Sequence, residues 1–140
     1  MSVTDEWIEG YLRELSEPEC LELLTSKRVG RVAYGDDRGI AVVPVNYVVH
    51  QGNILFRTSP HTSVGQHVRA ETVAFEVDDI EDGRRAGWSV LVRGSAMLEE
   101  PDELPDPQAE RPDPWPEGTR SMYVRISPRS ISGRMLTPAS

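Results

Sequence analysis

The chain has 140 residues, 38 % of them hydrophobic and 27 % charged, and its formal net charge is −8 at pH 7. This composition is typical of one soluble globular domain and argues against a nucleic-acid-binding protein, which normally has a basic face. Cys20 is the only cysteine and no apolar run approaches the length of a membrane span, so we expect no intrachain disulfide, no membrane partner and a cytoplasmic location.

The N-terminal residues 1–28 predict two short helices. In TDEWIEGYLREL (4–15) the apolar side chains recur at helical spacing. In the SEPECLELL that follows, Ser16 and Glu19 match a capping box, and Pro18 falls in the first turn, where proline is tolerated.

From Val29 onward the pattern predicts strands, and residues 29–136 read as a barrel within one domain spanning 1–140. Pro44 cannot donate to a ladder, so its strand should lie at an edge, a bulge or an opening of the sheet. One short helix is expected at about 63–70, between the third and fourth strands. The predicted strands are 29–35, 40–49, 54–58, 72–80, 88–100, 121–126 and a last short one in 129–136.

These elements predict a mainly β (α+β) fold: a six- to seven-stranded antiparallel barrel, closed or nearly closed. The run of acids at 78–82 reads as a solvated loop after a strand. Residues 101–118 hold six of the eleven prolines and are predicted to form a loop rather than a regular helix, with Trp115 lying over a partner surface.

The stretch FRTSPHTS (56–63) is the first candidate binding site. Arg57 ends a strand, and the hydroxyls that follow it precede a helix start, so the group could hold an anion such as a phosphate. A helix cap beside a solvated arginine is the alternative explanation of the same residues, and from these residues alone it is favoured, since such caps are common. The hydroxyl-bearing residues are Thr58, Ser59, Thr62 and Ser63.

Two further stretches could contact a flat ligand. In VPVNYVV, backbone groups freed near Pro44 could bond the edge of a heterocycle, although this stretch alone favours a half-buried strand whose Asn46 and Tyr47 face solvent. In GWSVLVRGSA, Trp88 could border an aromatic ligand or simply belong to the core. The three histidines form no metal-like cluster with carboxylates, and we name no metal ligand and no catalytic residue.

Taken in order, these segments resemble the pyridoxamine 5′-phosphate oxidase-like family of FMN-binding split β-barrels, and its short actinobacterial-type members in particular. The resemblance covers about residues 14–136. It rests on LSEPECLELLTSKRVGRVAY, VVPVNYVV, ILFRTSPHTS, VAFEVDDI, GWSVLVRGSA and VRISPRSISGR.

The resemblance implies a flavoprotein oxidoreductase that is a homodimer with two FMN sites at the subunit interface and a small-molecule substrate of unknown identity. Arg57 and Thr58 would hold the phosphate, aided by Ser59, Thr62 and Ser63. The backbone of Val45, Asn46 and Tyr47 would line the ring system. Residues from the other subunit would approach the same cofactor: Gly87, Trp88 and Ser89.

Similar members typically have a lysine where this chain has Ser63, so one cation near the phosphate is missing here. Two alternatives therefore stay open: a deazaflavin-dependent reductase on the same fold, and a dimeric binding module without cofactor. Arg125, Arg129 and Arg134 are scattered, which makes oxidation of pyridoxamine phosphate itself a weaker expectation than a general flavin reductase role.

Overall fold

The computed structural model describes residues 11–59, 63–67, 70–99, 104–105, 111–112 and 122–138. The described elements are β1 (Tyr11–Glu14), α2 (Glu17–Thr25), β2 (Val29–Asp36), β3 (Gly39–His50), β4 (Asn53–Thr58), α3 (Ser63–His67), β5 (Ala70–Glu81), η1 (Asp82–Arg84), β6 (Ala86–Leu98) and β7 (Met122–Thr137). None of the helices among these residues is long and apolar enough to cross a membrane.

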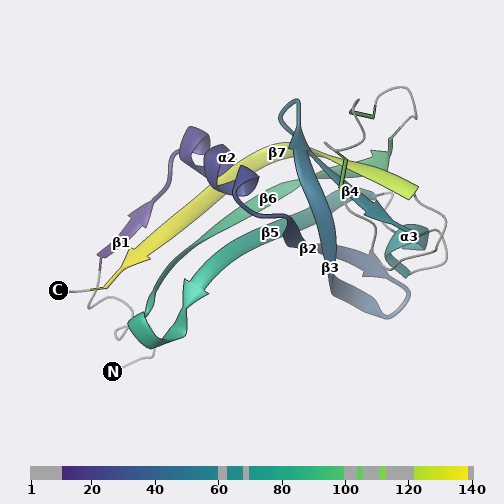
Figure 1. Cartoon of the computed structure of the whole chain (residues 1–140). Coiled ribbons are helices and arrows are strands. Elements are labelled where there is room, and N and C mark those ends of the chain that lie inside the picture. The colour runs from purple at the N-terminus through teal and green to yellow at the C-terminus, as the bar shows by residue number, and fades with distance from the viewer. Residues whose placement is uncertain are drawn as a thin grey trace.

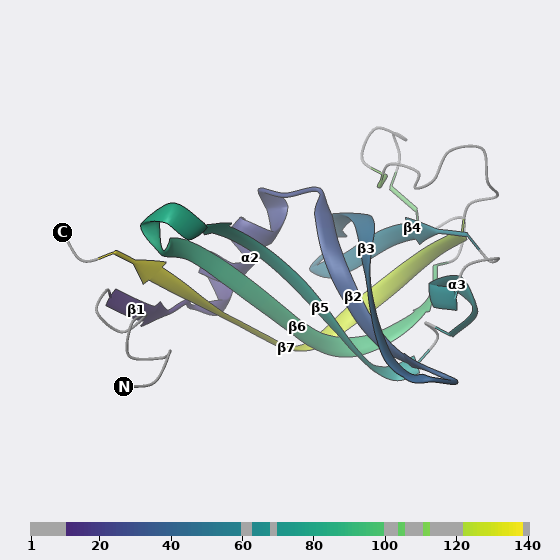
Figure 2. The ribbon, with the colours of Figure 1, turned by 90° about the horizontal axis from the view of Figure 1, so that it is seen from below.

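The strands form one antiparallel sheet in the order β1-β7-β4-β3-β2-β5-β6, and β7 also pairs with β6. This extra pairing closes every strand except β1 into a ring. The other edge of β7 pairs with β4 near its start and with β1 at its end. The molecule is elongated. In both views the β5–β6 turn and β1 lie at one end, and β4 and α3 lie at the other (Figures 1 and 2).

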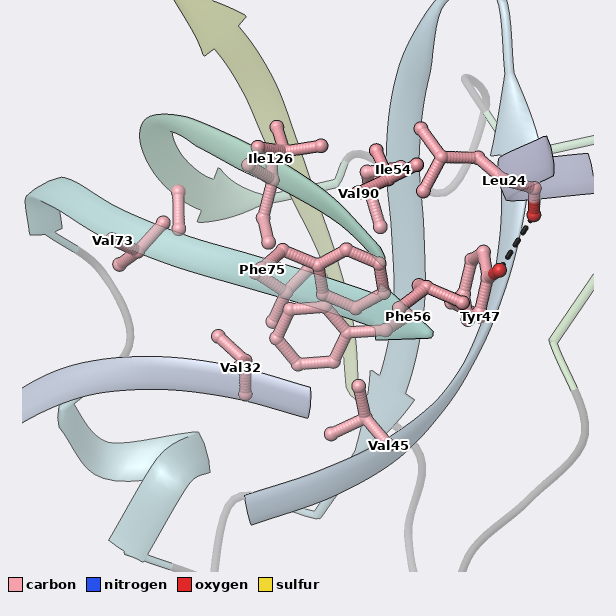
Figure 3. Close-up of a cluster of buried hydrophobic side chains, with 14 of the residues drawn as sticks. Leu24, Val32, Val45, Tyr47, Ile54, Phe56, Val73, Phe75, Val90 and Ile126 are labelled. Atoms are coloured by element: carbon pink, nitrogen blue, oxygen red, sulfur yellow. Dashed lines mark hydrogen bonds between the residues drawn. The ribbon is translucent and has the colours of Figure 1, made fainter. Parts of the chain in front are cut away.

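The core fills the inside of this ring, because alternate side chains of each strand point inward. Tyr47 and Phe75 meet edge to face, with ring centroids 4.9 Å apart. Leu24 brings α2 onto the same cluster, and the Tyr47 hydroxyl donates a hydrogen bond to the Leu24 carbonyl oxygen at 2.5 Å (Figure 3). Gly30 leaves room for the Phe75 ring, which a Cβ atom at this position would meet at 2.3 Å.

Helix α2 begins as the sequence predicts. The Ser16 side chain accepts a hydrogen bond from the Glu19 N–H, and the Glu19 carboxylate accepts one from the Ser16 N–H. Arg13 also contacts this carboxylate at 2.9 Å. The hydrogen bonds from the Ser16 backbone and the Arg13 guanidinium lower the pKa of Glu19 to about 2.

The helix predicted over residues 4–15 is wrong where the structure describes it. Residues Tyr11–Glu14 are strand β1, which pairs with the end of β7 and places Leu12 opposite Leu136. Strand pairing with a distant segment overrides the local helical spacing here. The rest of that predicted helix lies outside the described residues.

Two strand predictions also need correction. The sequence pattern predicts separate strands at 121–126 and 129–136, but β7 runs continuously from Met122 to Thr137. A register shift beside Gly94 accommodates Pro128 within it. The acidic run is not a loop, since β5 continues to Glu81. The predicted helix near 63–70 is observed as Ser63–His67.

Only four residues of the predicted proline-rich loop are described, 104–105 and 111–112. Pro105 and Pro112 are buried, and the Arg111 Nε atom donates a hydrogen bond to the Pro105 carbonyl oxygen at 2.9 Å. Trp115 lies outside the described residues.

Candidate functional site

Three residues of the candidate site lie side by side on neighbouring strands. Asn46 of β3 is opposite Arg57 of β4, which is opposite Tyr123 of β7. The Arg57 guanidinium carbon lies 5.4 Å from the centroid of the Tyr123 ring, a cation–π contact that orients the cation. Residues facing each other in an antiparallel pair point to the same side of the sheet, so these three share one face.

This face is the outer one, because the neighbouring residues point inward. Phe56 and Tyr47, next to Arg57 and Asn46, belong to the core cluster. Arg57 is half-buried, whereas Asn46 is only 8 % exposed. Arg57 is therefore a half-buried cation on the outer face of the sheet.

The residues that follow Arg57 provide buried hydroxyls. Thr58 and Ser59 are 6 % and 2 % exposed. Helix α3 begins at Ser63, although the side chain of Ser63 is not among those described. Thr62 lies outside the described residues, so its predicted contact with a phosphate stays a prediction.

Tyr47 and Val45 have structural roles in this chain. Both side chains are buried in the core, and the Tyr47 N–H donates a hydrogen bond to the Arg28 carbonyl oxygen at 2.9 Å. Burial raises the pKa of the Tyr47 hydroxyl, which keeps this donor protonated at neutral pH. Any contact of these two residues with a ligand must therefore come from the backbone.

One backbone edge of β3 is open next to this group. Residues 39–45 pair with β2, and pairing with β4 begins only at Asn46. Among the described residues, the opposite edge of 39–45 has no strand partner. Pro44 falls at this place, as expected for a residue without an N–H. A flat polar ligand could bond to this edge.

The second predicted group, Gly87 to Ser89, lies at the far end of the molecule (Figure 2). Leu98 of β6 pairs with Val124, next to the Tyr123 that contacts Arg57. Trp88 lies near the opposite end of the same 13-residue strand, which is about 30 Å away at roughly 3.3 Å per residue. One chain therefore does not bring the two predicted groups together.

Gly87, Trp88 and Ser89 also have individual places in the fold. A Cβ atom on Gly87 would lie 2.4 Å from the Asp79 carbonyl oxygen, so only glycine fits there. Trp88 is half-buried and packs against the core. Ser89, next along the strand, points to the outer face and lines a cavity.

The sequence interpretation missed a charged cluster on the outer face. The Arg31 guanidinium of β2 lies 3.0 Å from the Glu76 carboxylate and 3.1 Å from the Asp78 carboxylate of β5. Burial raises the pKa of Glu76 to about 7, the hydrogen bond and negative charge of Asp78 add to the shift, and the Arg31 guanidinium partly offsets it. The signal for this cluster in the sequence was the spacing of Glu76 and Asp78, because acids two residues apart on a strand lie on the same face.

The C-terminal arginines are spread along β7. Arg125 lies 3.3 Å from Glu99, near β4, while Arg134 is opposite Ser89 at the other end. Arg129 is exposed between them. They form no common cluster for a second phosphate.

Comparison with known proteins assigns the fold to a family. A family profile described as pyridoxamine 5′-phosphate oxidase matches residues 16–135. The chain belongs to this family. It is 35 % identical over 130 residues to the uncharacterized protein Rv0080 of Mycobacterium tuberculosis. The aligned region covers 86 % of this chain and 82 % of that protein.

Two solved structures share the fold of this pyridoxamine 5′-phosphate oxidase family member. A candidate pyridoxamine 5′-phosphate oxidase from Corynebacterium glutamicum is 33 % identical, with a TM-score of 0.75 and coverage of 92 % of this chain and 96 % of that one. An FAD-binding protein from Mycobacterium smegmatis is 31 % identical, with a TM-score of 0.69 and coverage of 91 % and 100 %.

Proposed function

We propose that this protein is a flavin-binding oxidoreductase whose ring of strands is the split barrel of its family. The observation that carries the proposal is the row Asn46–Arg57–Tyr123, in which a half-buried guanidinium lies beside an open strand edge. A flavin needs both features: a cation for its phosphate and backbone groups for the polar edge of its ring. The similarity to an FAD-binding protein supports the same assignment.

Arg57 would bind the phosphate nearest the flavin ring, which FMN and FAD both contain. Of the predicted donors that follow Arg57, Ser59 lies beyond the strand end and would act beside it, whereas Thr58 points to the opposite face of the strand and could contribute only through its backbone. The open edge of β3 near Val45 would hold the polar side of the ring. When bound, the flavin supplies the redox chemistry, so the protein residues bind and orient rather than react.

A homodimer completes the proposed site. The distance between Trp88 and Arg57 along the sheet means that only a second copy could bring residues 87–89 to the cofactor. An apolar outer stripe on β3 supports such pairing: Ile40 is 85 % exposed and Val42 is 60 % exposed. Exposed apolar stripes of this kind mark protein–protein contacts.

Titration of the purified chain with FMN, FAD and a deazaflavin tests the proposal, with flavin fluorescence quenching as the readout. We expect saturable binding of FMN or FAD by a dimer. Saturation by the deazaflavin alone would favour the reductase alternative. A stable dimer that binds none of the three would identify a binding module without cofactor and would refute the proposal.

The dimer is tested separately by light scattering of the Val42→Lys variant. Lysine keeps the strand but places a charge in the apolar stripe, so we expect monomers. Lys27→Ala, which removes a surface charge from a different segment, should leave the mass unchanged. A Val42→Lys variant that remains dimeric would show that the stripe is not the interface.

A further inference from the structure

Tyr123 of β7 is not among the residues that the sequence indicates for the flavin site, yet it lies directly beside Arg57. The two residues are opposite each other on β7 and β4, and the Arg57 guanidinium carbon lies over the Tyr123 ring, 5.4 Å from its centroid. Val124, the next residue of β7, belongs to the core, so the half-buried Tyr123 side chain is on the outer face of the sheet. Tyr123 is therefore part of the surface on which Arg57 would meet a phosphate.

The Tyr123 ring can orient Arg57 without neutralising its charge. Arg125, the next outward residue of the same strand, is held by a carboxylate instead and lies 3.3 Å from Glu99. A carboxylate cancels the charge that an anion needs, whereas an aromatic ring attracts a cation through its quadrupole and carries no charge of its own. A guanidinium over a ring also keeps its N–H donors at the rim of its plane, where a phosphate oxygen can accept them. This contact suits an arginine that binds an anion.

The Tyr123 hydroxyl supplies a second donor at this place. It forms no hydrogen bond with another residue in the described part of the chain, unlike the buried Tyr47 hydroxyl, which donates to the Leu24 carbonyl oxygen. The Tyr123 backbone is fixed, because its carbonyl oxygen accepts a hydrogen bond from the Glu99 N–H at 2.9 Å. A half-buried phenol O–H on a fixed strand can donate to a phosphate oxygen.

We propose that Tyr123 is a second phosphate-binding residue of the flavin site: its ring holds the Arg57 guanidinium in position, and its hydroxyl donates a hydrogen bond to the same phosphate group. A long arginine side chain loses rotamer freedom when it binds a ligand, and an arginine already held against a ring loses less. Tyr123 thus tightens flavin binding through Arg57 as well as directly. The inference rests on the proposed flavin function, in which Arg57 binds the phosphate nearest the flavin ring.

Titrations of the variants with FMN and FAD, followed by flavin fluorescence quenching, separate the hydroxyl from the ring. Tyr123→Phe removes only the hydroxyl and should weaken binding about fivefold, as expected for the loss of one hydrogen bond. Tyr123→Leu removes the ring as well and should weaken binding about fivefold further, the size of a cation–π contact at a partly exposed site. Tyr34→Phe deletes a phenol hydroxyl inside the core, and this matched control should bind flavin as the wild type does.

The Arg57→Ala background shows whether the ring acts through Arg57. With no guanidinium to hold, Tyr123→Phe and Tyr123→Leu should bind flavin equally in this background, although they differ about fivefold when Arg57 is present. A merely structural role of the ring would give the same difference in both backgrounds. Equal affinities of the two variants in the presence of Arg57 would also overturn the positioning role.

The phosphorus NMR signal of the bound FMN or FAD reports on the phosphate directly. We expect this signal to move in Tyr123→Phe, because the hydroxyl no longer donates to a phosphate oxygen, while the visible absorption spectrum of the bound flavin ring stays unchanged. An unchanged phosphorus signal together with an unchanged affinity in Tyr123→Phe would remove the hydroxyl from the site.

The affinities of the Arg57 and Tyr123 variants distinguish a failure of this inference from a failure of the proposed function. Wild-type affinity in Tyr123→Leu together with weakened binding in Arg57→Ala would overturn the role of Tyr123 and leave the flavin site at Arg57. Wild-type affinity in both variants, or no flavin binding by the wild type, would overturn the proposed function itself. The Tm of each variant identifies a loss that comes from unfolding, and Tyr123→Phe, which keeps the ring, tests the hydroxyl even if Tyr123→Leu fails to fold.

Discussion

Replacing Tyr47 by phenylalanine should destabilise the fold without changing the affinity for flavin. The Tyr47 side chain is 1 % exposed, and its hydroxyl donates to the Leu24 carbonyl oxygen (Figure 3). Phenylalanine keeps the ring and its edge-to-face contact with Phe75 but leaves that carbonyl oxygen without this donor. Loss of one partner of a buried hydrogen bond costs about 1–2 kcal/mol.

For a domain of this size, such a loss lowers Tm by about 3–8 °C, which differential scanning calorimetry resolves. Tyr34→Phe is a matched control, since Tyr34 is 3 % exposed and its hydroxyl forms no hydrogen bond with another described residue. We expect Tyr34→Phe to change Tm little. Equal losses in the two variants, or weaker flavin binding in Tyr47→Phe, would refute the structural role assigned to Tyr47.

Three further changes test other parts of the structure. Ser16→Ala should lower the free energy of unfolding, measured in urea, by about 1 kcal/mol. Because the pKa of Glu19 is lowered to about 2, the stabilisation that the Glu19 carboxylate adds to the cap should be present above about pH 4.5 and lost as the pH falls towards 2. Gly30→Ala should cost about 1–3 kcal/mol by overpacking against Phe75, whereas Gly35→Ala, whose Cβ meets nothing within 4 Å, should cost nothing in the same thermal assay. Glu76→Gln should stabilise the folded chain more at about pH 8 than at about pH 5, by on the order of 1 kcal/mol after allowance for the exposure of Glu76. Between about pH 4.5 and pH 7 the folded wild type holds a proton on Glu76 that the unfolded chain has lost, so wild-type stability falls as the pH rises through that window.

Local signals in the sequence predicted the elements that depend on neighbouring residues. The Ser16–Glu19 capping box placed the start of α2, because both hydrogen bonds form within one turn. Alternation predicted the strands around Val32 and Phe56, whose side chains fill the core. The approximate ends of these elements followed from the same patterns.

Features that depend on distant pairing were not predictable in the same way. Leu12 and its neighbours have helical spacing, but pairing with β7 makes them a strand. The contact of Arg31 with Glu76 joins residues that are 45 positions apart. Only the cross-strand register of β2 and β5 shows that they meet, so the outer-face cluster emerged from the structure alone.

For the candidate site, the sequence suggested Arg57 and Asn46, and the register places them opposite each other. The sequence did not show whether residues 45–47 would meet a ligand through their side chains or through their backbone. Burial of the Val45 and Tyr47 side chains depends on how the whole ring of strands closes. It also could not show that Gly87 is needed for close approach to Asp79.

The affinity of the Arg57→Ala variant for flavin is the most direct test of the central claim. Removing a charge-assisted hydrogen bond should weaken FMN or FAD binding by one to two decades, from about 1.5–3 kcal/mol, in a chain that keeps its wild-type Tm and mass. Arg38→Ala removes the same charge from the β2–β3 turn and should bind flavin as the wild type does. Equal flavin affinities in wild type and Arg57→Ala would contradict the account, because the phosphate would then be held elsewhere.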